Sequence, residues 1–184
     1  MDDFIAGVYV REILEQARLA QICFGHMNAA LRRNAEAQEV FFYAHAFLSH
    51  TANVSKLLWT GGQRGKVAVE RATRRCEHLR AMLGVANITL IEKRDARNRL
   101  EHYDEWLDTW VEESQSHNLI DMIISDPGGI AGAEPTDMFR FLDPNALTFT
   151  FRGETFNLRE MATALSQIEN AANAWKETQW WGRK

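Results

Sequence analysis

The first third of the chain contains two long segments in which apolar residues recur with the period of an α-helix. The first runs from about residue 3 to 33, and the second, from about 35 to 59, is rich in aromatic residues such as Phe41 and Phe47. Helices of this length gain most of their stability by packing apolar faces together. The pattern therefore predicts a helical bundle with a heavily buried second helix.

Glycines mark the ends of the next helical segments. After a turn at residues 61–65, a third helix is predicted from about 67 to 83, followed by Gly84, which suits the left-handed end of a helix. A fourth is predicted as one helix from about 88 to 113. Its buried side is expected to consist of Ala96, Leu100, Tyr103, Leu107, Trp110 and Val111.

Residues 117–156 differ in character and contain all three prolines. Between 147 and 151 apolar and polar residues alternate, and Gly153 can turn the chain, which predicts a small antiparallel hairpin. Asn157 and Glu160 have the spacing of a capping box, so a last helix is predicted to run to about residue 180. We expect a mainly α fold of four to five long helices, with residues 117–156 as an insertion within one domain spanning 1–184.

The predicted fourth helix carries the residues Arg97-Asn98-Arg99-Leu100-Glu101-His102. Asn98 lies one turn before His102, so its amide can bond the imidazole and fix which ring nitrogen faces outward. Arg97 lies about 140° around a straight helix from His102. Either its side chain curls around the helix, or Arg97 and His102 meet across the two-fold axis of a homodimer.

This pattern resembles the R-x4-to-6-H motif of the HEPN (higher eukaryotes and prokaryotes nucleotide-binding) superfamily, whose catalytic members commonly carry Asn, Asp or His directly after the arginine. The resemblance implies a HEPN-like helical bundle and a metal-independent endoribonuclease acting on single-stranded or looped RNA. His102 would be the general base or acid in attack by the 2'-hydroxyl, Arg97 would hold the phosphate, and Asn98 would orient His102 or bind an oxygen. It also implies a toxin or antiphage defence role with a neutralising antitoxin or regulatory partner.

Two other interpretations of the motif remain open. In the first, the segment is a solvated helix face on which Arg97 pairs with Glu101 and His102 is merely exposed. In the second, the chain is a non-catalytic HEPN-like dimer that binds a nucleotide, RNA or a partner protein through the same cleft.

Basic residues on the third helix provide a second candidate site. Their spacing indicates a stripe that could follow RNA phosphates, with two further cations just before it. These candidate RNA-binding residues are Arg71, Arg74, Arg75, Arg64 and Lys66. The alternative is a solvated face balanced by Glu70 and Glu77.

Trp180 and Trp181 could stack on bases, or close the bundle or a dimer contact.

His45, Ser49 and His50 on the second helix could line the cleft opposite His102, although a histidine on an otherwise apolar helix is more often a hydrogen-bonded core residue. Neither a metal-ligand spacing nor a complete phosphate-binding P-loop is present, so no metal and no cofactor are predicted.

The net charge of -4 argues against a general nucleic-acid coat protein. With no apolar run long enough to span a membrane and an acidic start, a cytoplasmic protein is expected.

Overall fold

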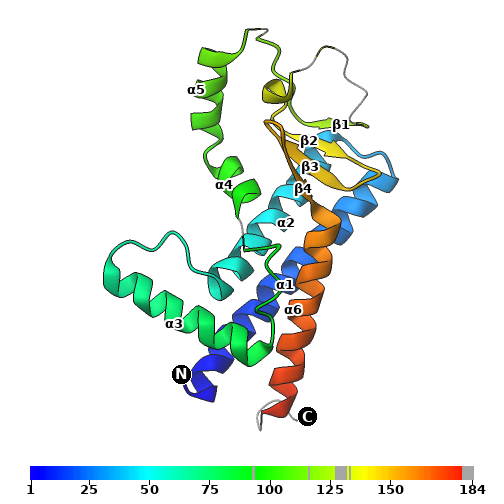
Figure 1. Cartoon of the computed structure of the whole chain (residues 1–184). Helices are drawn as coiled ribbons and strands as arrows, with labels where there is room; N and C mark the ends of the chain where they lie inside the picture. Colours follow the sequence, from blue (N-terminus) through cyan, green and yellow to red (C-terminus); the bar gives the residue numbers. More distant parts are fainter. Residues whose placement is uncertain (93, 116, 127–131, 133, 180–184) are drawn as a thin grey trace.

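The fold is mainly helical, with one small sheet (Figure 1). It is a computed structural model that describes the whole chain except residues 93, 116, 127–131, 133 and 180–184. The helices are α1 (Asp3–Arg32), α2 (Ala37–Leu58), α3 (Lys66–Leu83), α4 (Asp95–Glu101), α5 (Tyr103–Glu113) and α6 (Leu158–Thr178), with a short 3-10 helix at Pro135–Asp137. The predicted tryptophan pair, Trp180 and Trp181, lies outside the described residues.

Helices α1, α2 and α6 form the frame of the molecule. Helix α2 returns along α1, and α6 lies against α1 (Figure 1). Ile13 of α1, Phe47 of α2 and Ile168 of α6 are fully buried. At the edge of the contact, Gln21 donates a hydrogen bond to the carbonyl of Ala162 at 2.7 Å. The predicted bundle and its buried second helix are therefore confirmed, because the apolar stripes do face each other.

The predicted end of α3 and the predicted start of α6 are also confirmed. Gly84 adopts a left-handed conformation with φ of 68°, which the absence of a Cβ makes inexpensive. The side-chain oxygen of Asn157 accepts a hydrogen bond from the backbone N–H of Glu160 at 3.0 Å, as an N-cap does.

The single helix predicted from 88 to 113 is wrong, because it is divided into α4 and α5. His102 lies at the junction with φ of -103° and ψ of 34°. The two halves have different partners: Ala96 is buried where α4 meets α2, whereas Tyr103 packs edge-on against Phe139 beside the sheet. Val111, predicted to be buried, is 55% exposed.

The residues before α4 also differ from the prediction. Ile91 is buried in a non-helical segment, and the hydroxyl of Ser55 on α2 donates to the carbonyl of Glu92 at 3.1 Å. Helical spacing of apolar residues was therefore misleading here, since burial against α2 holds the segment in another conformation.

The insertion contains a four-stranded sheet rather than a hairpin alone. Strands β3 (Thr148–Phe151) and β4 (Glu154–Asn157) form the predicted hairpin, with Gly153 at φ of 80°. Strand β2 (Phe141–Asp143) pairs antiparallel with β3, and β1 (Ile123–Ile124) pairs parallel with β2. Strands of two or three residues are too short to show an alternating pattern, so the sequence did not reveal β1 and β2.

None of the helices in the described part of the chain has the length and apolar character needed to cross a membrane.

Candidate functional site

Arg97 lies on α4 and borders a hollow of about 400 Å³ between α2, the segment entering α4, and the junction of β4 with α6. We call it the α2–α6 hollow. The guanidinium forms an ion pair with Glu101, one turn further on, and donates weakly to the side-chain oxygen of Asn98 at 3.4 Å. Partial burial lowers the pKa of Arg97, and the nearby charge of Arg94 lowers it further. Arg97 is thus a partly desolvated cation with a second cation beside it.

His102 borders a different hollow of about 450 Å³, which we call the His102 groove. It is lined by Asp95, Asn98, Arg99, His102, Glu105, Trp106 and Glu154. The imidazole side chain is 56% exposed, and its Nδ1 lies 2.9 Å from Oε1 of Glu105. The ring is therefore both accessible and held by a carboxylate.

The Glu105 contact decides which ring nitrogen is available. An ionised carboxylate only accepts hydrogen bonds, so Nδ1 of the neutral ring must carry the hydrogen. Nε2 then keeps its lone pair and can take a proton, as a general base must. The side-chain oxygen of Asn98 accepts a weak bond from Arg97, while Asn98 lines the same groove as His102, so its role in orienting His102 or binding an oxygen stays a prediction.

Glu105 is a candidate that the sequence analysis did not select. It lies in an acidic stretch with Asp104 and Asp108, and its side chain is 73% exposed. The available signal was the spacing of three residues from His102, which places the two side chains on one helix face.

Arg97 and His102 do not share a pocket within one chain. Their hollows adjoin, with Asp95 and Glu154 lining both. The curled side chain that would bring Arg97 to His102 is not observed, and the meeting across a two-fold axis stays a prediction. The Arg97–Glu101 pair and the exposed His102 are also the contacts expected of a solvated helix face.

Arg99 forms one wall of the His102 groove. Its Nε donates to Glu154 at 3.1 Å, a second nitrogen pairs with the same carboxylate, and its guanidinium lies 4.6 Å from the centre of the Trp106 ring. This bidentate pair joins α4 to β4 and ties the motif to the sheet.

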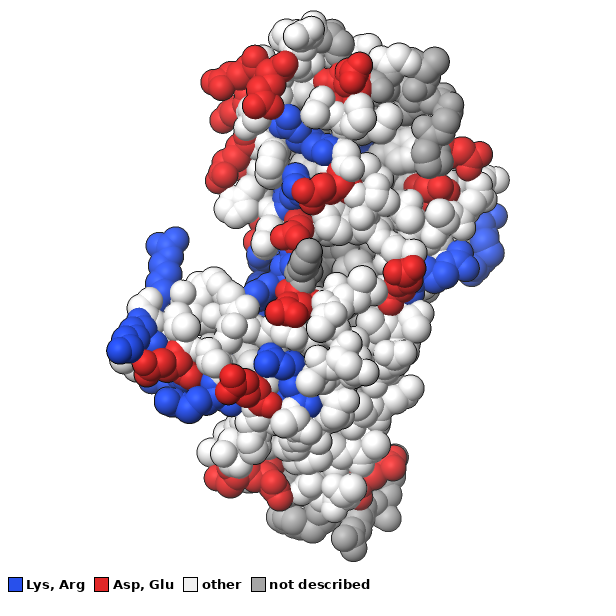
Figure 2. Space-filling model, in the orientation of Figure 1, with Lys and Arg blue, Asp and Glu red and all other residues white. Residues whose placement is uncertain are grey.

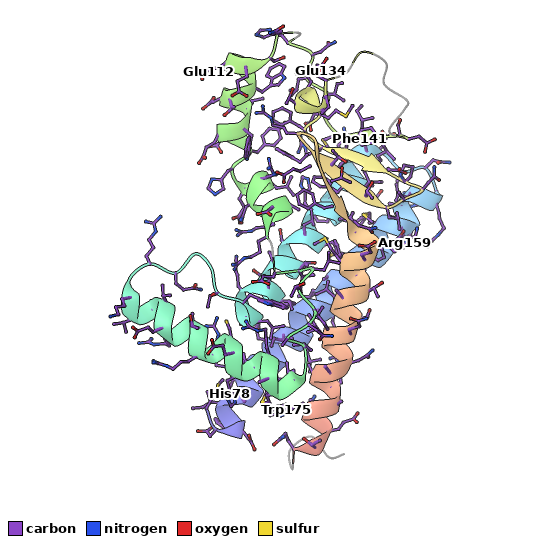
Figure 3. The ribbon with its side chains drawn as sticks, in the orientation of Figure 1. His78, Glu112, Glu134, Phe141, Arg159 and Trp175 are labelled. Atoms are coloured by element: carbon purple, nitrogen blue, oxygen red, sulfur yellow. The ribbon has the colours of Figure 1, made fainter. Side chains whose placement is uncertain are left out.

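The predicted basic stripe is only partly a surface feature. Arg64, Lys66, Arg71 and Arg74 are exposed, whereas Arg75 turns inward and donates to the carbonyl of Lys56 at 2.9 Å. Arg75 is therefore wrong as a phosphate ligand, because it joins α3 to α2. Figure 2 shows acidic side chains interspersed with the basic ones along α3. In Figure 3, His78 on α3 lies well away from α4 and α5.

The histidines of α2 lie outside both hollows. His45 packs near the rings of Phe41 and Phe149, and burial lowers its pKa to about 4, with a smaller lowering from Arg140. His50 bonds Gln16 on α1 at 2.8 Å, and Ser49 is exposed. These placements fit a structural role for His45. Within the described residues, no group of three or more His, Cys, Asp or Glu side chains could hold a metal ion.

No protein-family model matches the chain, and no curated protein or solved structure matches it either.

Proposed function

We propose that this chain is a HEPN-like endoribonuclease that cleaves single-stranded or looped RNA without a metal ion. The observation that carries the proposal is the accessible imidazole of His102, whose Nδ1 is held by Glu105 at the edge of a groove. A histidine fixed through one nitrogen with the other free is the arrangement that proton transfer near neutral pH requires.

In the proposed reaction, Nε2 of His102 takes the proton of a ribose 2'-hydroxyl. The 2'-oxygen forms a bond to the adjacent phosphorus, the bond to the 5'-oxygen breaks, and that oxygen takes a proton from a water molecule. The products are a 2',3'-cyclic phosphate and a free 5'-hydroxyl. Arg97 would neutralise the charge that develops on the phosphate, supplied from a second copy of the chain across a two-fold axis.

The test is incubation of the purified full chain with total RNA in EDTA. We expect cleavage by the parent protein and a loss of about 100-fold or more in His102→Ala, since a positioned acid or base typically contributes that much. Arg97→Ala should lose activity to a similar degree. Arg11→Ala removes an exposed cation of α1 and serves as the matched control.

A second candidate function is non-catalytic binding of RNA, a nucleotide or a partner protein. The separation of Arg97 and His102 into two hollows, with Arg97 already paired to Glu101, favours it. Intact RNA at high protein concentration with retained binding would support this candidate. A strictly monomeric mass in solution would count against the dimeric nuclease, because no second copy could then bring Arg97 to His102.

A further inference from the structure

The α2–α6 hollow combines an apolar interior with cations on one side. Its apolar lining includes Leu48, Ala52, Leu90, Ile91, Phe156 and Met161. Arg94 and Arg97 line the same hollow, with the carboxylates of Asp95 and Glu160. Small-molecule sites commonly have this construction, in which an apolar pocket carries a few polar groups that orient the ligand.

The two arginines that line the hollow repel each other, since the charge of Arg94 adds to burial in lowering the pKa of Arg97. Both charges also lower the pKa of Lys56 on α2, which lies outside the lining and whose pKa is lowered mainly by burial. One carboxylate of the lining, Glu154, is already paired with Arg99, and Arg97 is paired with Glu101 outside the hollow. An anionic phosphate group bound between these cations would relieve the repulsion, since it pairs with clustered basic side chains.

Arg94 is held in place by its surroundings. It donates a hydrogen bond to the carbonyl of Thr60 at 3.0 Å, and its guanidinium lies so close to Gly61 that a Cβ there would be only 1.8 Å from Nη2. The turn at residues 61–65 therefore leaves room for this guanidinium. A cation fixed by backbone contacts loses little conformational entropy when it binds an anion.

We propose that the α2–α6 hollow binds one unstacked nucleotide of an RNA strand, with the base in the apolar interior and the phosphate at Arg94 and Arg97. The identification of RNA as the source of that nucleotide rests on the proposed function. Proteins that recognise single-stranded RNA hold splayed bases in this way, and N–H groups of a base can donate to the carboxylates of Asp95 and Glu160. An inorganic phosphate would make no contact with the apolar lining, and a hydrocarbon would accept no hydrogen bond from Arg94 or Arg97.

The position of the hollow agrees with a role beside the cleavage site. It adjoins the His102 groove, and Asp95 and Glu154 line both. A strand with one base in the hollow would therefore pass its next phosphate toward His102. The base held in the hollow would then influence which phosphodiester is cleaved.

The test is calorimetric titration of the full chain with each of the four ribonucleoside 5'-monophosphates and with inorganic phosphate. We expect at least one nucleotide to bind about tenfold or more tightly than phosphate, the difference that burial of about 60 Å² of apolar surface supplies. Arg94→Ala should weaken that binding about tenfold, because a hydrogen bond to a charged group is lost. Ala52→Leu should weaken it by filling the hollow, whereas Arg11→Ala should bind as the parent does.

Nucleotide binding that is no tighter than phosphate binding would overturn the proposal, as would unchanged binding in Arg94→Ala. Ala52 is buried, so thermal unfolding of Ala52→Leu must first show a folded protein, and Arg94→Ala provides an independent answer at a partly exposed position. His102→Ala should bind the nucleotide normally. Nucleotide binding without any RNA cleavage would reject the nuclease and keep the hollow, whereas RNA cleavage without nucleotide binding would reject only the hollow.

Discussion

The helical frame (α1, α2 and α6) and the motif region (α4 and α5) are held in place by different kinds of interaction. In α1, α2 and α6, apolar side chains from each helix meet in a common core, and residues such as Phe47 are fully buried. In α4 and α5, by contrast, only Ala96 and Trp110 are buried. The candidate site is thus built on two helices that bury fewer residues than the frame does.

Polar contacts, together with the packing of Tyr103 and Trp110 against Phe139, attach α4 and α5 to the rest of the molecule. Arg99 pairs with Glu154 of β4, Arg152 donates to the carbonyl of Trp106 at 3.0 Å, and the indole of Trp110 donates to Asp137 at 2.8 Å. Such contacts depend on direction, whereas apolar burial depends mainly on area. We infer that apolar burial in the frame provides most of the stability of the fold, whereas a few directed hydrogen bonds and ion pairs determine how the side chains of the site are arranged.

The largest effect is expected from the frame. Phe47→Ala should lower the free energy of unfolding by about 3–5 kcal/mol, because it removes a fully buried ring that packs against Phe24. Val111→Ala on α5 is the matched truncation in the motif region and should change stability by less than about 0.5 kcal/mol, since Val111 is 55% exposed. Denaturant unfolding measures both. Equal losses in the two variants would break the distinction between the frame and the motif region.

A second effect should appear where the frame meets the sheet. His45 has a pKa of about 4 instead of its usual 6.5, because burial disfavours its charged form and Arg140 adds to this. The unfolded chain therefore binds a proton between pH 6.5 and 4 that the folded chain does not. This group destabilises the fold progressively as the pH falls through that window, by about 3 kcal/mol in total, and contributes nothing above it.

His45→Leu should remove that part of the acid sensitivity. The groups that affect the charge on His45 are Arg140 and Asp121, and both remain in the variant. The difference in unfolding free energy between parent and variant, measured by denaturant titration from pH 7 to pH 4, isolates the contribution of His45. A constant difference across this range would show that His45 is as easily protonated in the folded chain as in the unfolded one.

The same comparison explains how far the sequence predicted the fold. The frame was predictable because apolar periodicity records burial directly, and because Gly84 and Asn157 mark helix ends by local chemistry. The division at His102 was not predictable, because both halves have helical spacing. They differ only in their partners, which are α2 for Ala96 and the region beside the sheet for Tyr103. Tertiary contacts of this kind leave no periodic signal.

The candidate site was predictable as a set of residues and not as an arrangement. The motif identified His102 and Arg97 as candidates. The direction in which each side chain points, however, depends on the carboxylate with which it pairs, and the motif does not include that partner. Arg97 pairs with Glu101, as the solvated-face interpretation expects, whereas His102 contacts Glu105 and the spacing had pointed to Asn98. Several carboxylates in this segment have a spacing that would allow them to contact a given cation, and the sequence does not show which of them does.

The smallest effect is expected at Glu105, and it tests whether a directed bond does set the geometry of the site. Glu105→Ala should lower the RNA cleavage rate by roughly three- to tenfold, less than the loss of a buried charged bond, because water screens this exposed pair. Stability should stay within about 0.5 kcal/mol of the parent. Asp104→Ala is the control, since it removes the neighbouring carboxylate, which is not the partner of His102.

Glu105→Gln gives the sharper result, because its amide oxygen can still accept the hydrogen of Nδ1 while the negative charge is gone. If Glu105 acts by positioning the ring, Gln should restore most of the rate that Ala loses. If it acts by its charge, Gln should resemble Ala. Equal losses in Asp104→Ala and Glu105→Ala would show that the acidic surface as a whole matters, and that the specific bond to His102 does not.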